Sequence, residues 1–313
     1  MEKKPDSKRM NKLLDTLGKI NDENVVDREA VGFFSRLLLL CTLPHSNPGD
    51  NINVYSRKTN NIHLGIQPGF NMKTQKSFGV PFGVYPRLLL AFITTEVKKK
   101  KSPKIKLGKS LSEFMGKLGL EPSGGRWGNI TPLKNQMDRL FNSRILIQEF
   151  KDTSDTPSKS SNLQLIESSN EDDDGWNKQL TWWKKTHPNQ EVLFDNEITL
   201  SDKFFEELSS NPVPIDLDIL GSIRKSPLAI DLYLFLTYRT FTLRNFKKKT
   251  SIPWASLHKQ FGADYKEIKE FSRECKKQLN TLTQIYRGLN VDYSYGNLVL
   301  LPSTPSVPPK MNV

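Results

Sequence analysis

The spacing of apolar residues predicts the same succession of elements twice along this chain. An apolar helix, a short helix ending at a glycine and a longer amphipathic helix follow one another within residues 86–142. The same order returns within residues 227–286, about 141 positions later. In both longer helices the apolar side chains recur every three or four positions, which is typical of a helix with one buried face. We therefore expect two copies of a three-helix unit.

Local signals place the helix ends in both copies. In the first copy, Ser110-Leu-Ser-Glu113 has the pattern of a capping box, and Gly119 suits the left-handed turn that ends a helix. In the second copy, Gly262 ends the short helix, and Asp264-Tyr-Lys-Glu267 has the capping-box pattern again. The predicted helices cover residues 28–43, 88–97, 110–118, 129–142, 228–241, 253–261 and 264–286, with a short one ending at 208.

Short runs of β-forming residues predict a hairpin, the wing, after each copy. The pairs are 145–150 with 163–166 and 291–293 with 298–301, and a further pair, 53–55 with 62–66, precedes the first copy. Three helices and a wing indicate a winged-helix domain, so the predicted fold is mainly α with β-hairpin wings (α+β), in two tandem winged-helix domains. The expected division is a flexible N-terminus (1–27), a first domain (28–194) with an acidic wing tip or linker (152–175), a second domain (195–305) and a loose C-terminus (306–313).

The distribution of charge indicates the kind of partner. The net charge is +12, and residues 84–150 and 239–287 each carry +8, whereas 152–175 has seven acidic residues against one lysine. Because the positive charge belongs to the repeated unit, double-stranded DNA is the expected partner. The opening residues MEKKPDSKRM lack the apolar core of a signal peptide, and the longest apolar run is too short to span a bilayer. We therefore expect a cytoplasmic protein without a membrane partner.

The third helix of each copy is the candidate DNA-reading element, because polar side chains on its outer face can reach base edges while lysines neutralise phosphates. The candidates in the first copy are Arg126, Asn129, Thr131, Lys134, Asn135 and Arg139, with Lys98, Lys100 and Lys101 as backbone contacts. The candidates in the second copy are Lys248, Lys266, Lys269, Arg273, Lys276 and Lys277. A merely solvated helix face is the alternative, and the lysine run 98–101 also resembles a nuclear-import stretch. The recurrence of cations at the same element favours DNA.

No catalytic pattern is present in the sequence. Gly108-Lys109-Ser110 imitates the end of a phosphate-binding loop, but Pro103 stands where that motif needs a glycine. The histidines form no closely spaced pair, and the two cysteines have no zinc-binding spacing. We therefore expect no enzyme activity, no metal and no other cofactor.

Several stretches resemble the plasmid-encoded RepA family of replication initiators. They are GVPFGVYPRLLLAFITTE, LGKSLSEFMGKLGLEPSGGRWGNITPLKNQMDRLF, DLYLFLTYR and IPWASLHKQFGADYKEIKEF, within residues 50–305. The resemblance implies a non-enzymatic protein of the bacterial cytoplasm that binds repeated origin sequences on its own plasmid and recruits host replication proteins. Pro132 and Asp138 stand where a more basic helix is expected, which bears on the base contacts and not on the class.

Other functions remain as alternatives. A winged-helix transcriptional regulator without a replication role has the same chemistry, so the residues alone do not separate it from an initiator. A relaxase or primase lacks its catalytic residues here, and a pure adaptor protein leaves the matched cationic charge unexplained. The apolar stripe Val31–Cys41 either pairs two copies into a homodimer or packs against the first domain, and we favour packing.

Overall fold

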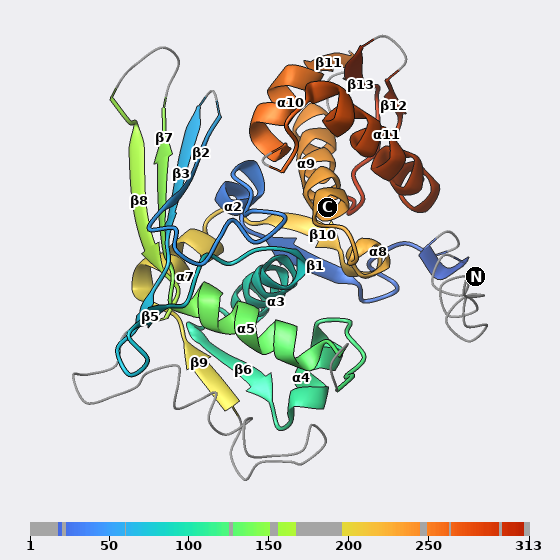
Figure 1. Cartoon of the computed structure of the whole chain (residues 1–313). Coiled ribbons are helices and arrows are strands. Elements are labelled where there is room, and N and C mark those ends of the chain that lie inside the picture. The colour runs from blue at the N-terminus through green and yellow to red at the C-terminus, as the bar shows by residue number, and fades with distance from the viewer. Residues whose placement is uncertain are drawn as a thin grey trace, which may run out of the picture. The chain divides into compact units, whose positions relative to one another are not determined.

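The computed structural model in Figure 1 describes most of the chain. The described residues are 18–20, 23–59, 61–124, 128–150, 156–166, 196–244, 249–262, 264–293 and 296–309. The chain divides into two compact units, one of residues 33–212 and one of residues 1–32 with 213–313. Both units mix helices with small antiparallel sheets, so the α+β class predicted from the sequence is confirmed.

The unit of residues 33–212 is built around one buried helix, α3 (Val84–Lys100). Almost every residue of this helix from Pro86 to Val97 is buried, the polar Arg87, Thr94 and Thr95 among them, so it is buried on all sides instead of along one stripe. The amphipathic helices α5 (Ile130–Phe141) and α7 (Asp202–Ser209) pack against it, as can be followed in Figure 1. The first apolar helix and the third helix of the first copy therefore form as predicted.

A four-stranded sheet of order β2-β3-β7-β8 is the other large element of this unit. Its strands are β2 (Tyr55–Lys58), β3 (Ile62–Gln67), β7 (Arg144–Glu149) and β8 (Lys159–Gln164). Ile66 pairs with Ile145, which in turn pairs with Leu163, and all three are buried, whereas their neighbours along each strand are more exposed. Both predicted hairpins form, although β2 covers 55–58 instead of 53–55 and β8 covers 159–164 instead of 163–166. The structure joins the two hairpins into one sheet.

The remaining elements of this unit are α2 (Arg36–Leu40), β4 (Phe70–Asn71), β5 (Lys76–Ser77), β6 (Lys104–Gly108), α4 (Leu111–Lys117) and β9 (Asn196–Thr199), with β4 paired to β5 and β6 to β9.

The short helix of the first copy, α4, starts nearly as predicted. The Ser110 hydroxyl accepts from the Glu113 amide at 3.1 Å, as a cap should. The Glu113 carboxylate accepts from the Lys109 amide at 2.8 Å, so the reciprocal bond is displaced by one residue from the predicted box.

The other unit contains the second copy in the order α9, β11, α10, α11, β12, β13. Their bounds are α9 (Pro227–Leu243), β11 (Thr250–Pro253), α10 (Trp254–Phe261), α11 (Ile268–Ile285), β12 (Val291–Asp292) and β13 (Asn297–Leu300). The strands form a sheet of order β11-β13-β12, and α11 packs against α9 and α10. The second predicted capping box is wrong, because the His258 ring bonds to the Tyr265 carbonyl at 2.9 Å, the Tyr265 amide donates to Gly262, and α11 begins only at Ile268.

The helix predicted over residues 28–43 is wrong in its first half. Residues Val31–Phe34 form strand β1, which pairs with β10 (Val213–Asp216), and α2 begins only after Ser35 caps it. The Arg28 guanidinium, almost buried, lies 2.5 Å from the buried Asp216 carboxylate just before α8 (Leu217–Ile223). The spacing of apolar residues over 31–34 is compatible with a strand as well as with a helix. Pairing with β10 and the nearby ion pair favour the strand.

The C-terminal segment predicted as loose is packed at Val307, whereas Pro308 and Pro309 are exposed. Val307 is buried in a cluster with Val25 and Ala30, and the Thr304 amide donates to Gly288 at 2.9 Å. Val25 lies in the predicted flexible N-terminus, so the structure differs from the prediction at Val25 and Val307. Burial of apolar side chains accounts for the difference.

The compact units divide the chain differently from the predicted domains. β9 and α7, expected to open a second domain at residue 195, belong with residues 33–212, and residues 1–32 belong with 213–313. β9 pairs with β6, and Lys159 of β8 lies 3.1 Å from Glu207 of α7. These pairings tie the segment to the preceding unit.

Candidate nucleic-acid interface

The helix α11 and the residues just before it present a group of cations that we name the α11 face, defined as Lys266, which precedes the helix, and Lys269, Arg273, Lys276 and Lys277 on the helix. Lys276 is half-buried and the other four are exposed. The buried residues of the helix, among them Phe271 and Leu279, recur on the opposite side. Among the described residues Lys266, Lys269 and Arg273 make no ion pair, so their charges remain available to a polyanion. The α11 face therefore places five of the predicted DNA contacts on one surface.

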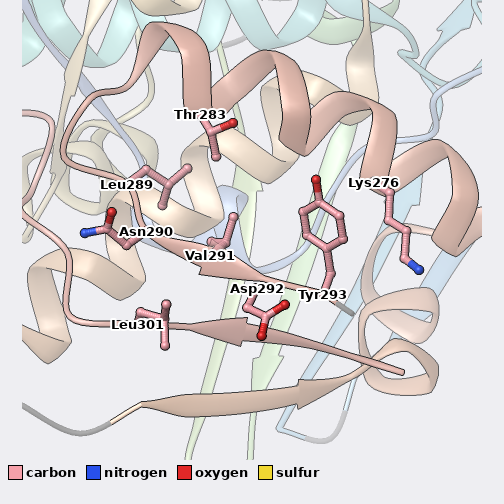
Figure 2. Close-up of a pocket in the computed structure, with 8 residues that line it drawn as sticks. All are labelled: Lys276, Thr283, Leu289, Asn290, Val291, Asp292, Tyr293 and Leu301. Atoms are coloured by element: carbon pink, nitrogen blue, oxygen red, sulfur yellow. The ribbon is translucent and has the colours of Figure 1, made fainter. Parts of the chain in front are cut away.

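The β12–β13 hairpin of the same copy, which is the predicted wing, lies against α11, as Figure 2 shows. The Tyr293 hydroxyl, directly after β12, donates to the Asn280 side chain of α11. The Lys276 ammonium lies 5.9 Å from the centroid of the Tyr293 ring and 6.0 Å from that of Trp254. A cavity of about 600 Å³ lies between helix and wing, lined by residues of both, including Thr283 and Leu301. The Lys276 ammonium thus lies at the outer limit of cation–π distance from two aromatic rings, beside the junction of helix and hairpin.

The corresponding surface of the first copy, the α5 face, carries far less charge. It consists of Thr131, Lys134, Asn135 and Asp138, of which Thr131 and Asn135 are exposed and the two charged residues are half-buried. One cation and one acid leave this face with no net charge, whereas residues 266–277 carry five cations against Glu267, Glu270 and Glu274, a net charge of +2. Uncharged polar groups at a helix surface suit base edges better than phosphates.

Asn129, a predicted base contact, holds the loop before α5. Its side-chain oxygen accepts from the Ser123 amide at 2.9 Å, and its amide group donates to the Glu121 carbonyl at 2.8 Å. Gly128 completes the loop, since a Cβ there would lie 2.2 Å from the Ser123 carbonyl oxygen. Both ends of the Asn129 side chain are therefore engaged within the protein.

Arg139, predicted on the outer face of the helix, is only 7 % exposed. Its guanidinium lies 2.8 Å from the Asp50 carboxylate, donates to the Asn135 side chain at 2.9 Å and lies over the Phe82 ring. Its hydrogen bond lowers the pKa of the Asp50 carboxyl group below its ordinary value. The helical spacing predicted Arg139 on the outer face because it gives no information on the other segments that cover this side of α5. Arg139 is therefore not a surface cation, and it instead joins α5 to the segments that contain Asp50 and Phe82.

The remaining predicted contacts lie elsewhere or outside the described residues. Lys98, Lys100 and Lys101 are exposed at the C-terminal end of α3, where Lys100 pairs with Glu96 one turn earlier. Lys101 ends the helix in the left-handed conformation, at φ 51°. Arg126 and Lys248 lie outside the described residues. The structure thus brings the α11 candidates together and leaves the α3 lysines on a separate element.

Neither a metal site nor a membrane span emerges from the described residues. No group of three or more histidine, cysteine, aspartate or glutamate side chains among them is arranged to hold a metal ion. None of the described helices is long and apolar enough to cross a membrane. Burial raises the pKa of the Cys41 thiol to about 12 and raises that of the Cys275 thiol as well, which keeps both protonated.

Comparison with known proteins places this architecture in a family. The family model described as plasmid encoded RepA protein matches residues 80–256, more than half of the chain. The matched stretch runs from the start of α3 to α10 and includes the α5 face. No curated protein and no solved structure matches the chain.

Proposed function

This chain belongs to the family of plasmid-encoded RepA proteins and is a plasmid replication protein, and we propose that it initiates replication by binding repeated origin sequences in duplex DNA. Membership of such a family implies DNA as a partner. The cationic α11 face beside its wing is the observation that supports the mechanism most strongly. We propose that α11 lies in the major groove, where its lysines and arginine contact phosphates and bases.

The order of elements supports a winged-helix interpretation of both copies. In the second, a helix, a strand, two helices and two strands follow one another, and the first strand pairs with the last. The first copy has the same order from α3 to β8, but β6 pairs with β9, and β7 and β8 extend the sheet of β2 and β3. We therefore propose two winged-helix modules, of which the first is the more elaborated.

The two modules would contribute differently to binding. The α11 face would supply most of the electrostatic affinity, because it carries five cations. The α5 face would supply sequence discrimination through Thr131 and Asn135. Joining two modules on one chain raises the effective concentration of the second once the first has bound, so a single module should bind much more weakly.

The family membership also motivates the remaining parts of the proposal. We propose that the bound protein recruits host replication proteins in the bacterial cytoplasm and performs no catalysis itself. A homodimer would bring two pairs of modules to adjacent origin repeats. These steps need only binding surfaces, in keeping with the absence of catalytic patterns in the sequence.

Supplying the chain in trans separates an initiator from a transcriptional regulator. The plasmid origin without its own copy of the gene is placed on a conditional replicon, and the chain is expressed from an unrelated constant promoter. We expect replication with the wild type and with Lys203→Ala, an exposed lysine of α7, and none with the Lys269→Ala/Arg273→Ala double variant. Origin binding without replication in trans would favour the regulator instead.

A further inference from the structure

The β4–β5 hairpin, residues 69–79, exposes two large apolar side chains. Met72 is 75 % exposed and Phe70 is 53 % exposed, and Met72 is the most exposed large apolar residue in the described part of the chain. Isolated surface methionines are common, but two large apolar groups on one projecting hairpin are not needed for its folding. Their exposure therefore calls for an occupant that covers them.

The hairpin turn is held in one conformation by its own polar groups. The Asn71 side-chain oxygen accepts from the amides of Lys73 and Thr74, both at 3.0 Å. The Gln75 side-chain amide donates to the Met72 carbonyl at 2.7 Å, and Gln75 itself has the left-handed conformation at φ 54°. A turn fixed in this way presents Met72 with little loss of entropy on binding.

Both ends of the hairpin are anchored on α5. A Cβ at Gly69 would lie 2.2 Å from the carbonyl oxygen of Asn142, the residue that ends α5. Gly79 has φ +80°, a conformation that side-chain-bearing residues rarely adopt, and a Cβ there would lie 2.3 Å from the Arg139 guanidinium. Figure 1 shows the hairpin projecting past the C-terminal end of α5. Whatever binds α5 would therefore meet the hairpin in a fixed position.

The charge around the apolar side chains indicates what covers them. Residues 67–79 contain Lys73 and Lys76, both exposed, and no acidic residue. An apolar tip with cations beside it suits the minor groove, where proteins insert Met or Phe between base pairs while lysines contact the phosphates.

We propose that this hairpin is a wedge that inserts Met72 and Phe70 between base pairs of the bound origin duplex. The inference rests on the proposed function, because the duplex must first be bound through the helices. Insertion unstacks a base step and kinks the duplex, and the additional contacts offset the free energy that this deformation costs. An unstacked step is a starting point for strand separation, so the wedge would help to open the origin.

Permanganate reactivity of thymines in the bound origin, measured beside a hydroxyl-radical footprint, tests the wedge. The Phe70→Ala/Met72→Ala variant should keep the footprint and lose permanganate reactivity several-fold, while Leu146→Ala, an exposed apolar residue on the nearby sheet, should match the wild type. Lys73→Ala/Lys76→Ala should weaken binding while leaving the reactivity of the bound complex largely unchanged.

Three results would overturn the inference, and each points to a different error. Unchanged reactivity in the Phe70→Ala/Met72→Ala complex would refute the wedge and leave the proposed function intact. A change in sedimentation of that variant without DNA, with reactivity unchanged, would show that the hairpin binds a second copy of the chain instead. No footprint with the wild-type chain would refute both the proposed function and the wedge.

Discussion

Removing two cations from the α11 face should change the salt dependence of DNA binding by a calculable amount. Each phosphate contact contributes about 0.9 to the slope of log affinity against log salt concentration, whatever the total number of contacts. The Lys269→Ala/Arg273→Ala variant should therefore have a slope about 1.8 less negative than that of the wild type. Between about 50 and 200 mM NaCl the wild type should lose about 12-fold more affinity than the variant.

Fluorescence anisotropy titrations with a labelled origin repeat measure these slopes directly. Lys203→Ala is the matched control, because it removes an exposed lysine from α7, outside both faces. Its slope should equal that of the wild type. Equal slopes for the wild type and the double variant would refute the assignment of α11 as the main phosphate-binding element.

Three further predictions concern the folded state. Arg139→Ala should lower the free energy of unfolding of the unit of residues 33–212 by about 2 kcal/mol, since it removes the hydrogen bond to the buried Val80 carbonyl and the ion pair with Asp50, whereas Arg144→Ala on the exposed strand position should cost less than about 0.5 kcal/mol; urea titrations that show equal losses would contradict the anchoring role. The Lys117 side chain and the Lys109 amide lower the pKa of the Glu113 carboxyl group, so the contribution of Glu113 to stability is complete above its ordinary pKa of 4.5 and is lost as the pH falls through the lowered value. Glu113→Gln should therefore flatten the fall of the urea midpoint at acid pH. An unchanged fall in that variant would count against the contribution of Glu113. Both thiols should resist alkylation at pH 8 in the native protein and react after unfolding, because burial raises their pKa values; rapid native labelling followed by mass spectrometry would disprove this.

Local patterns were sufficient for the helices and hairpins of both copies. The apolar spacing that predicted residues 129–142 and 228–241 as helices corresponds to α5 and α9, because each pattern describes contacts that the element itself makes with one core. The Ser110 cap and the left-handed Gly119 follow from equally local chemistry.

The features that depend on distant segments were not predictable in this way. Val31–Phe34 has a spacing that fits a helix, but its pairing with β10 involves residues far along the chain. Arg139 belongs by position to the outer side of α5, and only the fold shows that Asp50 and the loop containing Phe82 cover it. The β4–β5 hairpin was not predicted, because its two-residue strands are too short to show an alternation of apolar and polar residues. Only the structure shows the side-chain hydrogen bonds of Asn71 that form its turn.

Hydroxyl-radical footprinting on the plasmid's own origin, with the wild-type chain and its face variants, shows whether both helices bind one duplex. Two linked protected segments are expected in each repeat, with Lys269→Ala/Arg273→Ala losing one of them and Thr131→Ala/Asn135→Ala weakening the other. Protection that is absent, or that both variants leave unchanged, would contradict the claim that the two modules grip one duplex through these helices.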